Sequence, residues 1–130
     1  QNTSDKTSPP KELSLPKDMT SINSITENIL QSLNNNDYAS FSKDFSDTLK
    51  NTITAHVFLE LKNLILQTSG KYLSKSTPKL YEIAEVNAYD YPSEFEKESV
   101  FVTVSINPDS GKVEGISFDS DGLRATQTSG

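Results

Sequence analysis

Apolar residues recur at helical spacing in the first half of the chain and at alternate positions in the second half. The first helical stripe comprises Ile22, Ile25, Ile29 and Leu33, with Leu30 beside it. This spacing places the side chains on one face of a helix, and Asp18, Thr20 or Ser21 can cap its start. The pattern therefore predicts a first helix that ends near the asparagines of "LNNND".

The segment "NNND", residues 34–37, has two interpretations. Asparagine tolerates the left-handed conformation that ends a helix, and asparagine or aspartate caps the start of the next one. A calcium loop instead needs oxygen ligands at alternating positions and a glycine at its turn. Asn34, Asn36 and Asp37 lack that spacing, and no glycine is near. We therefore interpret the segment as a hinge between two helices, with Asn36 or Asp37 as the cap.

Two further helices are predicted after the hinge. The second carries the stripe Tyr38, Phe41, Phe45 and Leu49. The third spans residues 53–69 and has two apolar stripes. The first comprises Ile53, Val57, Leu61, Leu64 and Ile65, with Phe58 beside it, and the second comprises Ala55, Leu59 and Leu66. A helix that is apolar around most of its circumference is usually buried between layers. We therefore expect both stripes to lie under a sheet, with Gly70 ending the helix.

After Gly70 the period changes from helical to alternating. "KYLSKS" and "KLYEIAEVNAYDY" predict strands, and "ESVFVTVSIN" predicts a half-buried strand. "NPDSGK" predicts a turn and "KVEGISFDS" the last strand, whereas "DGLRATQTSG" is expected to fray. Helices followed by strands predict an α+β fold, in which an antiparallel meander curls over the third helix.

Composition changes the picture at the N-terminus. Residues 1–17 are rich in Ser, Thr, Lys and Pro, and this composition predicts a flexible polar tether. The rest of the chain is then a single α+β domain over residues 18–124, followed by a frayed end over residues 125–130. Gln1 stands where methionine would begin a chain, and two origins stay open: export behind a signal with a lipid-bearing cysteine, or truncation of a disordered N-terminus. We favour export, hence an extracytoplasmic location with membrane attachment only through an upstream anchor.

Charge and residue usage exclude several kinds of partner. The net charge is −6 and Arg124 is the only arginine, so we expect no nucleic-acid binding, which needs a basic face. The chain has no cysteine, which excludes disulfides and thiolate sites. No segment reaches the roughly 18 consecutive apolar residues of a membrane helix.

Three stretches carry a resemblance: "NNNDYASFSKDFSDTLKNTI", "LKNLILQTSGKYLS" and "SVFVTVSINPDSGKVEGISFDS". They resemble the nuclear-transport-factor-like superfamily, the cystatin-like cone shared with ketosteroid isomerase and scytalone dehydratase, and within it a prokaryotic exported domain family of unknown function. The resemblance implies N-terminal helices packed in a curved antiparallel sheet, with a pocket between helices and sheet. It carries over no catalytic residue, because the carboxylate base and acidic hydrogen-bond donors of isomerase-type sites have no recognisable counterparts here.

His56 and Glu60 form the best chemical pair in the chain. His56 is the only histidine, and Glu60 follows it by four positions, so both face one direction from the third helix. Zinc needs further protein ligands, and the chain offers no second histidine and no cysteine. We therefore interpret the pair as part of a solvated polar strip, and expect no metal and no cofactor.

Tyr81, Tyr89 and Tyr91 are candidates for a ligand site, together with His56. Interpreted as lying on one strand, the tyrosines share a sheet face and can line a cavity with amphipathic rings. The alternative is an ordinary position at the core edge or sheet surface. A nucleophilic serine lacks its setting, because only His56 could be the base and no Gly-x-Ser-x-Gly turn occurs. "TSGK" follows a helix instead of opening one, so it predicts no phosphate loop.

Two functional hypotheses follow. The first is a non-enzymatic accessory or binding domain that takes a small apolar ligand or a protein partner, including a homodimer through its sheet. The second is a small enzyme of the isomerase or dehydratase type that uses the pocket between helices and sheet. A carboxylate facing the cavity favours the enzyme, whereas an all-apolar cavity or a flat exposed sheet favours binding.

Overall fold

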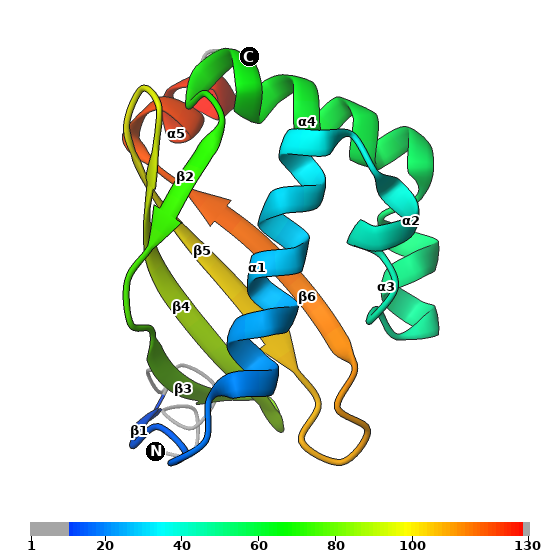
Figure 1. Cartoon of the computed structure of the whole chain (residues 1–130), viewed down its shortest axis with the longest axis vertical. Helices are drawn as coiled ribbons and strands as arrows, with labels where there is room; N and C mark the ends of the chain where they lie inside the picture. The colour runs from blue at the N-terminus through cyan, green and yellow to red at the C-terminus, as the bar shows by residue number, and fades with distance from the viewer. Residues whose placement is uncertain (1–10, 129–130) are drawn as a thin grey trace, which may run out of the picture.

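A computed structural model describes residues 11–128 and contains helices and a single sheet (Figure 1). The helices are α1 (Thr20–Asn35), α2 (Tyr38–Phe41), α3 (Asp47–Thr52), α4 (Ala55–Thr68) and α5 (Asp121–Thr128). The strands are β1 (Lys11–Leu13), β2 (Tyr72–Lys75), β3 (Lys79–Ile83), β4 (Val86–Phe95), β5 (Ser99–Ile106) and β6 (Val113–Asp119). The described residues therefore have an α+β fold with an antiparallel sheet, which confirms the predicted fold class.

The sheet is open and runs in the order β1-β3-β4-β5-β6. The long strand β4 pairs with β3 in its first part, where Asp90 lies opposite Lys79, and with β2 in its last part, where Phe95 lies opposite Tyr72. Strand β6 lies at an edge. Among the described residues, only the start of β6 has a neighbour on the outer side, through a parallel bridge between Phe45 and Val113.

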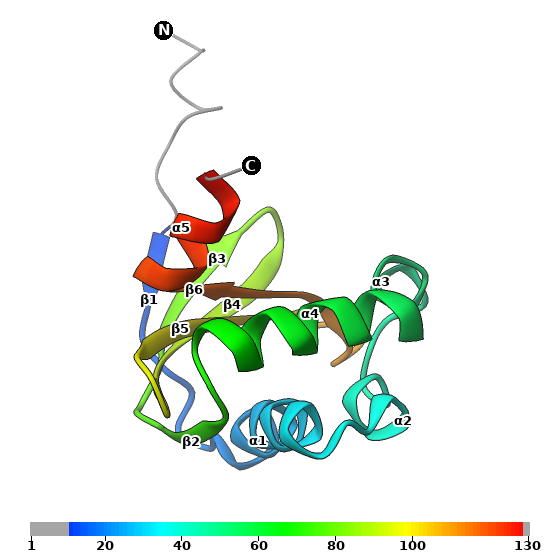
Figure 2. The same cartoon turned by 90° about the horizontal axis from the view of Figure 1, so that it is seen from above.

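Helices α1 and α4 lie on the same side of β5 and β6, as the view from above shows (Figure 2). Alternate residues of β5 point to this side and form the core, because strand side chains alternate between faces. The buried residues of β5 are Val100, Val102, Val104 and Ile106. Phe101 points to the opposite face and is 47 % exposed. The predicted half-buried strand is therefore confirmed.

The hinge predicted at "NNND" is confirmed by backbone geometry. Asn36 ends α1 in the left-handed conformation, with φ 58° and ψ 45°. Asp37 caps α2, because its carboxylate accepts a hydrogen bond from the Ser40 backbone N–H at 3.2 Å. The start of α1 differs from the expectation, because the capping residue is Met19, which makes no side-chain hydrogen bond to the helix. Asp18, one of the expected caps, accepts a hydrogen bond from the Thr20 backbone N–H at 3.0 Å.

The prediction of one continuous second helix is wrong, because its apolar residues lie in two short helices, α2 and α3, and in the segment between them. Between them, Ser46 donates its backbone N–H to Val113 O, and Asp44 O accepts from the Val113 N–H. These bonds to β6 interrupt the helix, and the Ser46 side chain then caps α3. Phe41 and Phe45 are nevertheless fully buried, as the apolar spacing indicated.

The burial predicted for the third helix, now α4, is also wrong. Only Phe58 and Ile65 are buried within it, while Leu61 is half-buried and Leu59 is 45 % exposed. The reason is that α4 lies near the β6 edge of the sheet, so the sheet covers only part of its circumference (Figure 2). Gly70 follows the capping residue Ser69 with φ 85°, as the glycine expected at this end.

Both ends of the described chain have more structure than predicted. Lys11–Leu13, within the predicted tether, forms β1 and pairs with β3. Asp121–Thr128 forms α5 instead of fraying, and Leu123 of this helix is 3 % exposed. Residues 1–10 and 129–130 lie outside the described residues, so the tether prediction is untested there.

Candidate functional site

The most apolar candidate site is a pocket of about 310 Å³ between α4 and β6, which we call the α4–β6 slot. Its lining residues are Ile53 before α4; Val57, Leu61, Leu64 and Ile65 on α4; Ile116, Ser117 and Phe118 on β6; and Leu123 on α5. The slot exists because α4 and the inner face of β6 face each other at the open edge of the sheet. No further described strand fills the space beside them.

The slot has a buried floor and partly buried walls. Ile65 and Leu123 form the floor and are nearly inaccessible. Leu61, Ile116 and Phe118 are only partly buried, so apolar surface remains in contact with water. Among the lining residues, Ser117 is the only polar one, and none is titratable. The slot can therefore exclude water from an apolar ligand, but it offers no acid, base or metal ligand.

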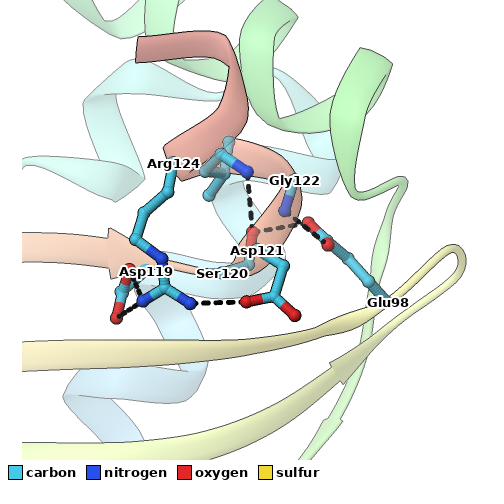
Figure 3. Close-up of polar contacts among 7 residues, drawn as sticks. Glu98, Asp119, Ser120, Asp121, Gly122 and Arg124 are labelled. Carbon is cyan, nitrogen blue, oxygen red and sulfur yellow. Dashed lines mark hydrogen bonds and ion pairs between the residues drawn. The ribbon is translucent and has the colours of Figure 1, made fainter. Parts of the chain in front are cut away.

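A carboxylate holds α5 against the end of the slot (Figure 3). Glu98, in the turn between β4 and β5, accepts hydrogen bonds from the Ser69 hydroxyl at 2.6 Å, the Ser120 hydroxyl at 2.5 Å and the Gly122 N–H at 3.1 Å. Partial burial raises the pKa of this carboxyl, but the hydrogen bonds outweigh it and keep the pKa below its ordinary value. Glu98 thus joins the end of α4 to the start of α5 and positions Leu123.

Arg124 adds a second, exposed connection at the same place. Its guanidinium contacts both carboxylate oxygens of Asp119 at 2.9 and 3.0 Å, and Asp121 at 2.5 Å (Figure 3). Exposed ion pairs contribute little to stability, so this contact orients α5 on β6 more than it stabilises the fold.

A polar cluster joins α1 to β2 on the other side of the molecule. Glu27 of α1 accepts hydrogen bonds from the Tyr72 hydroxyl at 2.7 Å, the Lys75 ammonium at 2.5 Å and the Gln31 amide at 2.9 Å. Burial alone would raise the pKa of Glu27, but these three donors and the charge of Lys75 lower it to about 2. Glu27 therefore stays ionised near neutral pH, and its low pKa makes it a weak proton acceptor there.

Tyr91 is a fully buried residue of β4 whose side chain faces α1. Its hydroxyl donates to Asn23 Oδ1 at 2.8 Å, and burial raises its pKa. The Thr26 hydroxyl, also fully buried, has no hydrogen-bond partner among the described residues. A buried polar atom without a partner costs about 1–3 kcal/mol of stability.

The structure separates the three tyrosines that we expected on one strand face, which corrects that expectation. Ala84 and Glu85 adopt left-handed φ values of 49° and 70° and turn the predicted strand into the β3–β4 hairpin. Tyr81 lies opposite Ala88, so it is on the outer face of the sheet. Tyr89 and Tyr91 point inward, and both are buried.

His56 and Glu60 lie on α4 as expected from their spacing. His56 Nε2 is 3.3 Å from Glu60 Oε2, and the two side chains are 80 % and 68 % exposed. Within residues 11–128, no group of three or more potential ligand side chains is placed to hold a metal ion. That the pair has no chemical role stays a prediction.

The comparison with protein families gives one match. The model of the family described as "Protein of unknown function (DUF3887)" matches residues 26–116. The chain belongs to the DUF3887 family. The matched segment runs from α1 into β6 and ends at Ile116, so it includes all of α4 and only the first part of the β6 wall of the α4–β6 slot. Neither the curated proteins nor the solved structures gave a match to this DUF3887 domain.

Between residues 11 and 128, the DUF3887 domain has no helix with both the length and the apolar character needed to cross a membrane.

Sequence reasoning missed several residues that form these sites. Ile116 and Phe118 were assigned to a strand without a partner, and Lys75 was assigned to the predicted strand "KYLSKS" without a role. Only tertiary contacts bring Lys75 to Glu27 and place Ile116 opposite α4. The alternation Ile116-x-Phe118 was the one available signal for a shared face.

Proposed function

We propose that this DUF3887 domain is a non-enzymatic binding domain that takes a small apolar molecule in the α4–β6 slot. The observation that carries the proposal is the lining: eight of its nine residues are apolar, and none is titratable. Ligand pockets commonly have volumes of about 300–1,000 Å³, so the slot suits a ligand at the small end of that range. An apolar ligand would displace water from partly buried side chains such as Leu61 and Ile116, which is favourable at about 25 cal/mol per Å² of apolar surface.

The enzymatic alternative has weaker support. An isomerase- or dehydratase-type site would need a carboxylate facing the cavity, and the α4–β6 slot has none. Glu27 is a partly buried carboxylate outside the slot, but its three donors and low pKa keep it ionised and engaged. A protein partner that inserts an apolar side chain would use the same slot, and a homodimer would use the outer sheet face around Phe101.

The wider setting is part of the same proposal. Membership of the nuclear-transport-factor-like superfamily is supported by the three resembling stretches and by an antiparallel sheet with α1 and α4 on one face. An extracytoplasmic location, reached through an upstream anchor, is supported by the polar, proline-containing composition of residues 1–17.

Fluorescence of the neutral apolar probe N-phenyl-1-naphthylamine tests the proposal. We expect saturable binding by the natural protein and its loss in Leu61→Glu, because a charge in an apolar slot would have to be desolvated beside the probe. Leu61 is half-buried, so the variant should keep the fold, which circular dichroism checks.

Leu73→Glu is the matched control, because Leu73 lies on β2, is 60 % exposed and does not line the slot. It should bind the probe as the natural protein does. Equal binding by Leu61→Glu and the natural protein, or equal loss in both variants, would refute the slot as the binding site.

A further inference from the structure

A second pocket, of about 360 Å³, lies between the first turn of α1, the β2–β3 connection and β4. We call it the α1–β2 pocket. The residues that give it chemistry are Asn23, Lys75, Ser76, Thr77 and Tyr91, and its apolar walls are Met19 and Pro78. It shares no lining residue with the α4–β6 slot.

The Lys75 ammonium and the Asn23 amide nitrogen in this pocket can only donate hydrogen bonds. Lys75 has three N–H donors and spends one on Glu27, which leaves two. Asn23 uses its oxygen to accept from Tyr91, and its amide nitrogen makes no hydrogen bond to any described residue. The hydroxyls of Ser76 and Thr77 likewise have no partner among the described residues. A ligand rich in acceptors would therefore satisfy the pocket best.

The local electrostatics favour an acceptor that is negatively charged. The Lys75 side chain is only 15 % exposed, so water screens its charge less than it screens a surface lysine. The pocket also lies at the N-terminal end of α1, where the helix dipole favours anions, and the first turn of α1 contains no acidic residue. Glu27 and the exposed Asp18 oppose this attraction, since Glu27 holds Lys75 and Asp18 accepts from the Thr20 N–H.

We propose that the α1–β2 pocket binds a small organic acid, with its carboxylate held by Lys75 and the Asn23 amide and its short apolar part against Met19 and Pro78. Carboxylate hydrogen bonds to charged and amide donors are stronger than those of a neutral oxygen, which makes the acid group the main determinant of affinity. Ser76 and Thr77 supply further donors at the rim.

Benzoate and benzyl alcohol, which differ at the acid group, test the pocket by NMR titration of the ¹⁵N-labelled protein near neutral pH. We expect saturable benzoate shifts at Asn23, at residues 75–77 and at Tyr91, with affinity about tenfold or more above that of benzyl alcohol. Equal affinity for both compounds, or benzoate shifts confined to the α4–β6 slot, would overturn the proposal.

Variants of the ion pair give opposite expected effects, which a purely structural role would not produce. Lys75→Met should weaken benzoate binding by about tenfold or more, because it removes the cation. Glu27→Gln should strengthen it, because the lysine then loses its competing carboxylate. Lys79→Met is the control, since Lys79 is exposed on β3 and lies outside the pocket. Unchanged binding in Lys75→Met, equal weakening in Lys79→Met, or weaker binding in Glu27→Gln would refute the assignment.

Discussion

Single side chains provide the connections between α1 and β2. Asn34 imitates a strand partner, because its amide nitrogen donates to Tyr72 O at 2.9 Å and its oxygen accepts from the Tyr72 N–H at 3.0 Å. Glu27 then binds Tyr72 and Lys75 through their side chains. Because β2 pairs only with the last part of β4, these contacts with α1 help to keep the strand in place.

At this scale we expect Glu27→Gln to lower the free energy of unfolding at about pH 7 by on the order of 1 kcal/mol, since solvent screens a side chain that is 41 % exposed. The folded pKa, about 2, lies below the ordinary value of 4.5. The stabilisation is therefore complete above pH 4.5 and disappears as the pH falls through about 2. Urea unfolding of both proteins across this range measures it, and a difference independent of pH would contradict the expectation.

Among the elements, α5 depends on a close approach that only glycine permits. A β-carbon at Gly122 would lie 2.8 Å from Thr68 Cγ2 and 2.9 Å from both Glu98 carboxylate oxygens. Neither neighbour can move freely, because Thr68 is β-branched and Glu98 is held by three hydrogen bonds. The docking of α5, and with it Leu123 in the slot, therefore rests on this contact.

We expect Gly122→Ala to destabilise the domain by about 1–3 kcal/mol through overpacking, although alanine usually stabilises a helix relative to glycine. Gly115→Ala is the control, because a β-carbon there would meet only Ser105, at 3.8 Å. It should change stability by about 0.5 kcal/mol or less. Thermal denaturation compares the two variants, and equal melting temperatures would show that α5 does not depend on the contact.

For the molecule as a whole, the sheet includes a strand from the segment that composition marked as a tether. Lys11–Leu13 pairs with β3, and Leu13 and Leu15 pack against the core. The apolar surface of these two leucines makes this segment part of the folded domain, since partial burial of such side chains contributes about 1–3 kcal/mol.

Two truncations test this assignment. Removal of residues 1–17 should lower the melting temperature by about 3–10 °C, because it removes β1 and both leucines. Removal of residues 1–9 alone should change it by about 2 °C or less, since that segment has no apolar residue except its proline. Equal melting temperatures for the two truncated proteins would show that β1 does not stabilise the domain.

The sequence by itself determined α1, α4, β2, β5 and β6 and the order of helices before strands, because periodicity and caps depend on residues that are close along the chain. Asn36 and Asp37 are the clearest case, since their preference for helix ends needs no tertiary context.

The tertiary structure decided which faces of the helices and strands meet. Ala84 and Glu85 carry no turn signal, and their left-handed conformation, which costs roughly 1–2 kcal/mol per residue, is offset by the pairing of β3 with β4. The same pairing separated Tyr81 from Tyr91, and the position of α4 at the sheet edge left Leu61 only partly buried. Both candidate pockets lie between elements far apart in sequence, so only long-range packing could create them.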